Sequence, residues 1–315
     1  MLAYVVALVA AFGAMSALAQ DDPFGPRFAR TYPEIAAVFA DIAQANPTLV
    51  TKHSLLTTQG GRELALYSLG SASAKKRVLL ICNHHGDEQW VAQLCVDFVK
   101  YLVWAKDRDP LVHDVLARGV IDVVPLGNPD GFAAQSRYNA RGNDINRNFP
   151  YQWSHVEQGT SNARPGPAPA SEAETKALMA YQLAHKDEWA VILNYHLRYE
   201  GSDGANYILT PWAYTRHATL TAAEENLYRP FYPTQDEAPT FTVDTVPNVF
   251  YPCPGTHTDW SWATFGAPAL TMELGHGYEL PTRTTYVETF LKTENLPVLR
   301  RFLTGYLAAL SPPPR

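Results

Sequence analysis

The feature that most constrains the fold is an alternation of short apolar runs with longer segments of helical periodicity. Arg77–Cys82 and Val120–Pro125 are nearly continuous aliphatic runs of strand length, and Trp90–Val103 between them repeats apolar residues at helical spacing. Two more runs, Ala190–Tyr195 and Ala267–Met272, read as further buried strands. This alternation predicts an α/β fold with a mixed, mainly parallel sheet flanked by helices.

The segments on either side of this alternating region complete the predicted fold. Pro33–Asn46 has helical periodicity, and Leu49–Ser54 and Glu63–Ser68 are extended runs joined by a glycine-containing turn. The tail Val287–Leu310 is periodic and precedes three prolines. We therefore expect a helix and a hairpin at the start of the domain and a long helix at its end.

The middle of the chain contains turn signals and one predicted helix start. Asn128–Gly131 and the Pro- and Gly-rich segment Ala163–Ala170 predict long surface loops between them, of the kind that often carry function. Ser171 and Glu174 have the spacing of a capping box, which predicts a helix from there to about His185.

Composition limits the number of domains and the kinds of partner. The chain has 315 residues, of which 46% are hydrophobic, and this fits one large domain over residues 20–315. Its net charge of −6 and lack of a dense basic run exclude an electrostatic site for nucleic acid. Three cysteines, an odd number, are too few for a disulfide framework, and we expect Cys82 and Cys95, in a predicted strand and helix, to be buried, inert thiols.

The first 19 residues resemble a secretory signal peptide. Leu2–Ala19 is almost wholly apolar and ends in Ala17-Leu18-Ala19 before the polar Gln20. Cleavage near Ala19–Gln20 would give a secreted or periplasmic protein with no stable membrane partner. The run carries no Lys or Arg before it and is long enough to span a bilayer, so an uncleaved anchor stays open.

Potential metal ligands and acids gather where the predicted strands end. His85, His196 and Glu273 each lie just beyond one of three predicted strands, and in open α/β sheets ligand sites form at that edge. Zinc binds imidazole nitrogen and carboxylate oxygen, and a catalytic site has three protein ligands. His85 and Glu88, at i and i+3, supply two, and His196 is the candidate for the third.

Several short motifs follow one another along the chain and enclose these residues. Each is weak evidence alone, but their order makes the combination specific. The motifs are His85-Gly86-Asp87-Glu88, Asn128-Pro129-Asp130-Gly131, Gly142-Asn143-Asp144-Ile145-Asn146-Arg147-Asn148-Phe149, Ser171-Glu172-Ala173-Glu174-Thr175, His196, Tyr251 eight positions before Asp259-Trp260, and Thr271-Met272-Glu273-Leu274.

In this order the motifs resemble the zinc metallocarboxypeptidases of the carboxypeptidase A type. The resemblance implies the three-layer sandwich of that family and one Zn²⁺ per chain, bound by His85, Glu88 and His196 with water in the open position. It also implies that Glu273 is the general base that takes the proton of this water and passes it to the leaving amine. The expected reaction is hydrolysis of a C-terminal peptide bond.

The resemblance also assigns the residues that contact the substrate. Arg137 matches the arginine that polarises the scissile carbonyl, with Arg141 as a rival for this role. Asn146, Arg147 and Tyr251 match the groups that bind the terminal carboxylate, which an arginine can hold bidentately. The expected partner is therefore a peptide, or a peptidoglycan peptide, with a free C-terminal carboxylate.

Other functions remain open at this stage. One is a cell-wall peptidase that cuts amide bonds at D-amino acid or diaminopimelate residues, and another is a catalytically dead carboxylate-binding relic. A deacylase of acylamino acids is disfavoured by Tyr251 and by Asp259-Trp260. By resemblance Thr258 points towards the pocket for the last side chain, while His257 and His276 are expected to be exposed and have no assigned role.

Overall fold

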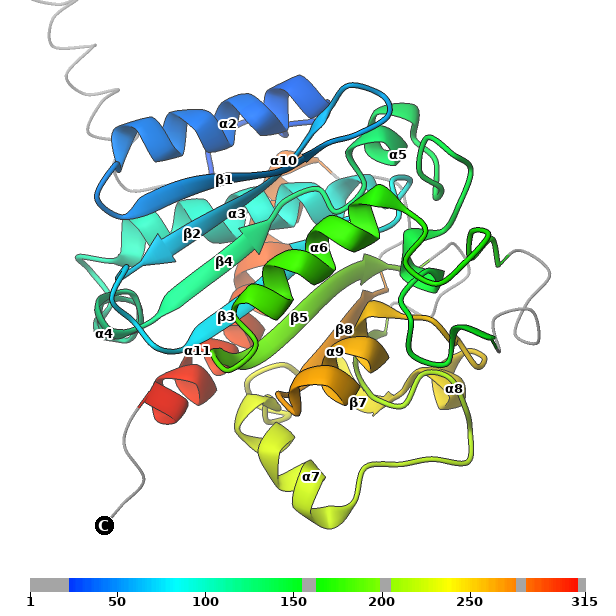
Figure 1. Ribbon diagram of the computed structural model, residues 1–315. Coiled ribbons are helices and arrows are strands. Elements are labelled where there is room, and N and C mark those ends of the chain that lie inside the picture. Colours follow the sequence, from blue (N-terminus) through cyan, green and yellow to red (C-terminus); the bar gives the residue numbers. More distant parts are fainter. Residues whose placement is uncertain (1–22, 155–162, 199–204, 276–281, 311–315) are drawn as a thin grey trace, which may run out of the picture.

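A computed structural model describes residues 23–154, 163–198, 205–275 and 282–310 of the chain. Their centre is a single eight-stranded sheet with the order β1-β2-β4-β3-β5-β8-β6-β7 (Figure 1). The four central strands β4, β3, β5 and β8 are parallel to one another. The pairs β1–β2, β2–β4 and β6–β8 are antiparallel. The predicted mixed, mainly parallel sheet is confirmed. The strands are β1 (Val50–Thr57), β2 (Glu63–Gly70), β3 (Arg77–Cys82), β4 (Val120–Val124), β5 (Trp189–Leu197), β6 (Asn206–Thr210), β7 (Phe241–Thr245) and β8 (Ala269–Leu274).

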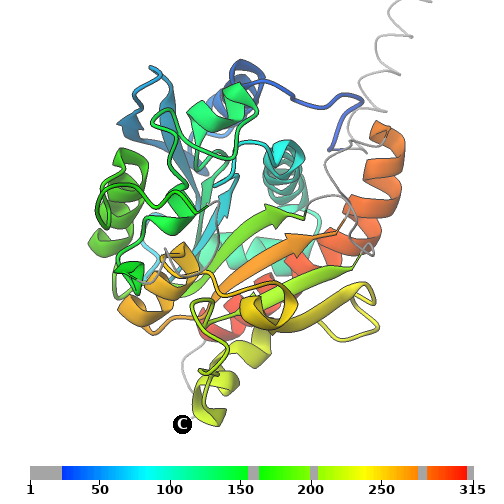
Figure 2. The same ribbon diagram turned by 90° about the vertical axis from the view of Figure 1, so that its right-hand side faces the viewer.

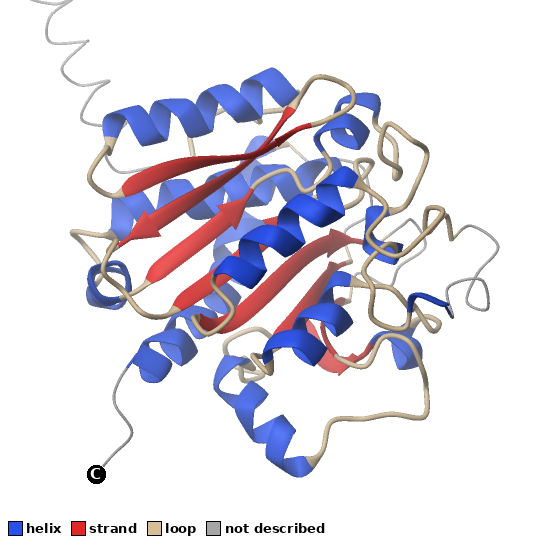
Figure 3. Ribbon diagram, in the orientation of Figure 1, coloured by secondary structure: helices blue, strands red, loops and turns tan. Residues whose placement is uncertain are grey.

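Helices cover both faces of the sheet, which gives three layers (Figures 2 and 3). Helices α6 and α9 lie on one face, and α3 and α11 lie on the other. The helices are α2 (Tyr32–Ala45), α3 (Gln89–Ala105), α4 (Pro110–Arg118), α5 (Pro129–Ala134), η1 (Ile145–Arg147), α6 (Ala173–Ala184), α7 (Ala222–Tyr228), η3 (Arg229–Phe231), α8 (Val246–Val249), α9 (His257–Phe265), α10 (Arg283–Thr285), the π-helix η4 (Tyr286–Asn295) and α11 (Leu296–Leu310).

The sequence of the central strands explains why both faces need a cover. In β3, β4 and β5 almost every residue is buried, because helices pack on both sides and no face is left for polar residues. One buried charge among these strands is Asp122 in β4, whose carboxylate accepts hydrogen bonds from Arg77 Nη1 at 3.0 and 3.1 Å and from Ser68 Oγ at 2.6 Å. A charge inside the sheet is thus fully paired.

The predicted capping box at the start of α6 is wrong. Ser171 and Glu174 form no capping box, since α6 begins at Ala173 and its N-cap residue Glu172 makes no side-chain cap. Instead, the Ser171 hydroxyl donates to Glu172 Oε1 at 2.8 Å and accepts from Asn148 Nδ2 at 3.0 Å. These polar residues hold a loop rather than a helix end.

The strand ends also differ from the prediction. His196 and Glu273 lie inside β5 and β8, one residue before each strand ends, and not beyond them. The reason is that backbone pairing continues through the register His196↔Glu273 and Leu197↔Leu274. His85, by contrast, does follow the end of β3.

The N-terminal prediction cannot be compared with this fold, because residues 1–19 lie outside the described residues. Of the helices that are described, none combines the length and the apolarity needed to cross a bilayer. Cys82, Cys95 and Cys253 are all buried and carry free thiols, which confirms the predicted burial of Cys82 and Cys95.

Candidate active site

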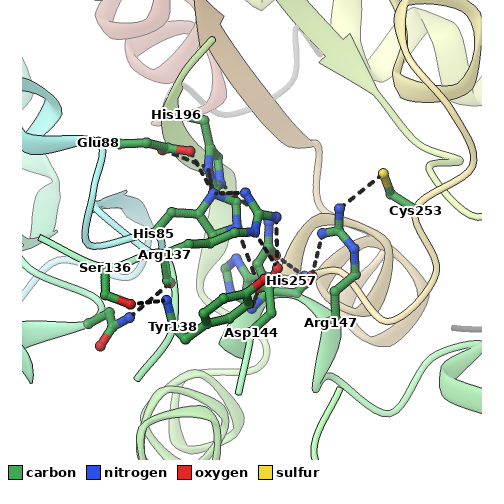
Figure 4. A network of polar contacts seen from close by, with 12 residues as sticks. His85, Glu88, Ser136, Arg137, Tyr138, Asp144, Arg147, His196, Cys253 and His257 are labelled. Carbon is green, nitrogen blue, oxygen red and sulfur yellow. Dashed lines mark hydrogen bonds and ion pairs between the residues drawn. The ribbon is translucent and has the colours of Figure 1, made fainter. Parts of the chain in front are cut away.

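Three potential metal ligands converge at the carboxyl edge of the sheet. Ligand atoms of His85, Glu88 and His196 lie within 4.8 Å of one another, and all three residues are buried. Nδ1 of His85 lies 2.6 Å from Glu88 Oε1 and 3.2 Å from Nδ1 of His196, which is itself 3.1 Å from Glu88 Oε2 (Figure 4). These residues form the metal-binding triad that the sequence predicts.

The loop between β3 and α3 places the first two ligands. Asn83 adopts a left-handed backbone conformation with φ of 62°, and its Nδ2 donates to the backbone oxygen of Glu88 at 3.0 Å. Gly86 packs directly on the backbone of α5, where an added Cβ would lie 1.9 Å from the carbonyl carbon of Gly131. The tight loop therefore depends on a residue with no side chain at position 86.

Burial and charge set the protonation of the triad. Burial alone would raise the pKa of Glu88, but His85 and His196 outweigh it and hold this pKa well below the usual range. The pKa of His85 rises to about 9, because Glu88 and Asp144 overcome the opposing effects of burial and Arg137. Burial lowers the pKa of His196, with Glu88 acting in the opposite direction. The site therefore favours an ionised Glu88 and a positive charge on His85, but not on His196.

The donor set fits a small divalent cation. Two imidazole nitrogens and one carboxylate are ligands that zinc accepts, and nitrogen atoms at tetrahedral positions around zinc lie about 3.3 Å apart. The 3.2 Å between the two Nδ1 atoms agrees with that spacing. In addition, Nε2 of His85 lies 3.4 Å from Asp144 Oδ1, so a carboxylate stands behind one of the ligands.

Glu273 lies beside the triad on the neighbouring strand. In the parallel pairing of β5 and β8 it is directly opposite His196, so both side chains project from the same face of the sheet. Burial and the negative charge of Glu88 raise the pKa of Glu273 to about 8, although His85, Arg137 and Arg198 act against them. Such a carboxyl group can both accept and release a proton near neutral pH.

Arg137 is locked in place by a buried carboxylate. Its Nε and Nη2 both donate to Asp144 Oδ2, at 2.9 and 2.7 Å, and its Nη1 lies 3.2 Å from Nδ1 of His85 (Figure 4). The rival Arg141 is half exposed and lies 3.7 Å from Glu172. The structure thus brings Arg137, and not Arg141, to the metal ligands. The role of Arg137 in polarising a carbonyl stays a prediction.

The three predicted carboxylate-binding residues have different surroundings. Asn146 accepts from the backbone N–H of His257 at 2.9 Å through Oδ1, and its Nδ2 lies 3.3 Å from His196 Nε2. Arg147 is buried and contacts Cys253, whereas Tyr251 is 41% exposed. Asn146 and Arg147 are neighbours in the short helix η1. This helix therefore contacts the metal ligand His196 through Asn146 and contributes Arg147 to the predicted carboxylate site.

Several supporting residues have no assigned role in the sequence. Asp144 caps η1 through Oδ1, which accepts from Asn146 N at 2.9 Å, and it also holds Arg137. The loop around Asp144 is tied to α6 by Asn139 Nδ2, which donates to Glu172 Oε2 at 2.8 Å. The position of Asp144 two residues before Asn146-Arg147 was the available signal, but no spacing rule says which carboxylate faces an arginine.

His257 and Thr258 belong to a buried polar cluster next to the site. The expectation that His257 is exposed is wrong: it is fully buried, and its Nδ1 lies 2.7 Å from Asn194 Oδ1. Burial, reinforced by His196, lowers the pKa of His257 to about 3, which keeps the ring neutral. Thr258 Oγ1 accepts from Asn194 Nδ2 at 3.0 Å and lies 2.7 Å from the Thr271 hydroxyl. His276 lies outside the described residues.

Comparison with known proteins identifies the family. The family model described as "Zinc carboxypeptidase" matches residues 35–294, which include every residue of the site. The chain belongs to the zinc carboxypeptidase family.

Individual zinc carboxypeptidases are distant in sequence. Human carboxypeptidase A6 is 26% identical over 279 residues, which are 79% of this chain and 62% of that protein. Human carboxypeptidase B is 26% identical over 294 residues, 82% of this chain and 67% of that protein. The chain therefore spans about two thirds of the length of these curated relatives.

Solved zinc carboxypeptidase structures share the fold. The crystal structure of thrombin activatable fibrinolysis inhibitor superposes with a TM-score of 0.75 and 18% identity, covering 88% of this chain and 74% of that one. Carboxypeptidase A from Helicoverpa armigera gives a TM-score of 0.71 at 18% identity, over 92% and 75% of the two chains. The three-layer sandwich implied by the sequence motifs is confirmed.

Proposed function

We propose that this chain is a secreted or periplasmic zinc metallocarboxypeptidase that hydrolyses the C-terminal peptide bond of its substrate. One observation carries the proposal: the His85–Glu88–His196 triad shares a site with Glu273. A triad alone could be structural, but a carboxyl group on the neighbouring strand, directly opposite His196, supplies the proton acceptor that hydrolysis needs.

The metal of this site is proposed to be a single Zn²⁺ held by the triad. When bound, zinc lowers the pKa of a water molecule and polarises a carbonyl group. The side chains of the protein carry out the proton transfers. Glu273, in its ionised form, takes the proton of the attacking water and delivers it to the leaving amine, and a pKa above the usual range makes this carboxylate a stronger base.

Two arginines divide the recognition of the substrate in this proposal. Asp144 fixes two nitrogens of Arg137 and leaves Nη1 beside the metal ligands, where it can donate to the oxyanion that forms from the scissile carbonyl. In the same proposal Arg147, which is buried, binds the terminal carboxylate together with Tyr251. Sensing a chain end in this way makes the enzyme an exopeptidase.

The experiment is a panel of N-blocked dipeptides that differ only in the last residue, assayed with the purified protein. We expect turnover that a chelator abolishes and Zn²⁺ restores, and we expect C-terminally amidated versions to react far more slowly. Peptidoglycan peptides ending in D-amino acids or diaminopimelate are assayed in parallel. Turnover of those alone would favour the cell-wall peptidase, and a metal-free yet fully active protein would overturn the proposal.

The proposed localisation can be tested separately. The proposal that residues 1–19 are removed on export predicts a mature N-terminus at or near Gln20 in protein recovered from the periplasm or the medium. N-terminal sequencing of that material measures it. Protein that stays in the membrane fraction with residue 1 intact would show an uncleaved anchor instead.

A further inference from the structure

The thiol of Cys253 links two residues of the proposed carboxylate site. Arg147 Nη2 donates a hydrogen bond to Cys253 Sγ at 3.2 Å, and Figure 4 shows this contact. The Cys253 thiol in turn donates to the backbone oxygen of Tyr251 at 3.3 Å. A single sulfur atom therefore accepts from Arg147 and donates to the segment that carries Tyr251.

Cys253 is itself held rigidly. Its backbone N–H donates to the carbonyl oxygen of Ala213 at 2.7 Å, and its side chain is 5% exposed within a small apolar cluster. Leu209, Ala213 and Val246 are the other buried members of that cluster. Because this packing fixes the position of the sulfur, the sulfur can hold the groups that it contacts in fixed positions.

Arg147 depends on such fixed contacts because it is a buried charge. The residue is 6% exposed, and besides the thiol its Nη1 donates to the backbone oxygen of Asn146 at 3.0 Å. Each terminal nitrogen of a guanidinium carries two N–H groups. The contacts with Cys253 and Asn146 use one N–H on each nitrogen, so each keeps a second that can bind a carboxylate oxygen.

We propose that Cys253 is a positioning residue of the carboxylate site, which orients the Arg147 guanidinium and the Tyr251 backbone to receive the terminal carboxylate of the substrate. The inference rests on the proposed function and deepens it. Because the thiol touches neither the metal ligands nor Glu273, its loss should weaken binding of the carboxylate and leave the chemical step intact.

The test compares Cys253→Ala, Cys253→Ser and the matched control Cys95→Ala. Alanine removes both hydrogen bonds, serine keeps one donor and one acceptor, and Cys95 is a buried thiol in α3 that does not contact Arg147. For a dipeptide with a free carboxylate we expect Cys253→Ala to raise KM about tenfold with kcat nearly unchanged, since tenfold corresponds to the loss of about one good hydrogen bond to a charged group. Cys253→Ser should recover most of the loss, and Cys95→Ala should behave as wild type.

A binding measurement separates this inference from the proposed function. An N-acetyl amino acid resembles the product and carries the free carboxylate, and calorimetry measures its affinity without any turnover. Weaker binding to Cys253→Ala supports the inference even if no peptide is cleaved. Wild-type KM and wild-type affinity in an active Cys253→Ala enzyme overturn it and leave the proposed function standing. An equal loss in Cys95→Ala also overturns it, because the effect would then be general destabilisation.

Discussion

Two carboxyl groups in this site have opposite pKa shifts, and the difference supports the separate roles proposed for them. Glu88 faces two imidazoles, which keep it ionised and suited to bind a cation. Burial and the charge of Glu88 raise the pKa of Glu273 to about 8, which suits proton transfer. Neighbouring groups with divergent pKa values are a common mark of acid–base catalysis.

Replacing Glu273 by glutamine tests its role. The amide has nearly the same shape but cannot accept a proton, so we expect kcat to fall by about 10²- to 10⁴-fold, the usual contribution of a general base. Zinc content should stay at the wild-type level, because Glu273 is not one of the triad. Steady-state kinetics and metal analysis of the same preparation measure both. Wild-type turnover on every substrate would rule out the general base.

The pH dependence of zinc affinity follows from the same shifts. Before metal binds, His85 has a pKa of about 9 and Glu273 one of about 8, so both hold protons at pH 6 to 7. Coordination requires an unprotonated imidazole, and the cation lowers the pKa of the nearby carboxyl group. Zinc therefore displaces a proton from each group, and affinity should rise with pH and level off above about pH 9.

Calorimetric titration of zinc into chelator-treated protein, in two buffers with different ionisation enthalpies, counts the released protons. Glu273→Gln is the matched variant, because it lacks one of the two titrating groups while the triad is unchanged. It should release about one proton fewer at pH 7 than the wild type does. Equal counts for both proteins would show that Glu273 releases no proton when the metal binds.

The sequence predicts residues with distinctive chemistry better than it predicts their supports. His85, Glu88 and His196 could be found because they have the side chains that zinc accepts and because the motifs that contain them occur in a specific order. Asp144 and Cys253 could not, because an aspartate or a cysteine in a loop has many ordinary uses. Only the folded positions show that each contacts one arginine of the site.

At the level of elements, the loops of the site are fixed by contacts between segments distant in sequence. Glu172, at the start of α6, accepts from Asn139 and donates its backbone N–H to Asn148 Oδ1 at 3.0 Å. The spacing of Ser171 and Glu174 suggested a capping box because such a box is a local pattern. In the folded chain the Ser171 hydroxyl contacts Asn148 instead, so it does not cap the helix.

The close packing of the β3–α3 loop on α5 gives a prediction at this scale. An alanine at Gly86 would place its Cβ 1.9 Å from the backbone of Gly131, and backbone atoms cannot move aside cheaply. We expect Gly86→Ala to destabilise the protein by about 1 to 3 kcal/mol, as overpacking usually does. Because the loop carries His85 and Glu88, its displacement should also weaken zinc binding, by at least about tenfold.

Gly266→Ala is the control for this variant. Gly266 ends α9 with φ of 62°, and an added Cβ would meet nothing within 4 Å, so only backbone strain of about 1 kcal/mol is expected. Thermal melts and zinc titrations of both variants distinguish the two effects. If Gly86→Ala bound zinc as tightly as Gly266→Ala does, the packing on α5 would not position the ligands.

At the level of the whole molecule, the sequence reveals the centre of the sheet more clearly than its far edge. The central strands β3, β4 and β5 are buried on both faces and so appear as continuous apolar runs. The edge strand β7 has the sequence Phe241–Thr245 with exposed residues in its middle, and β6 beside it was likewise not predicted. A short polar strand gains its stability from pairing with neighbours, which a local pattern does not reveal.

The metal site connects separate parts of this fold, and this gives a last prediction. His85 and Glu88 lie between β3 and α3, whereas His196 lies on β5, so a bound cation joins the helical layer to the middle of the sheet. A ligand at about 1,000 times its Kd stabilises the folded state by about 4 kcal/mol. For a chain of this size we expect zinc to raise Tm by roughly 5 to 10 °C. His196→Ala removes the ligand from β5, so its Tm should no longer respond to zinc; a full response in that variant would mean that the stabilising ion binds elsewhere.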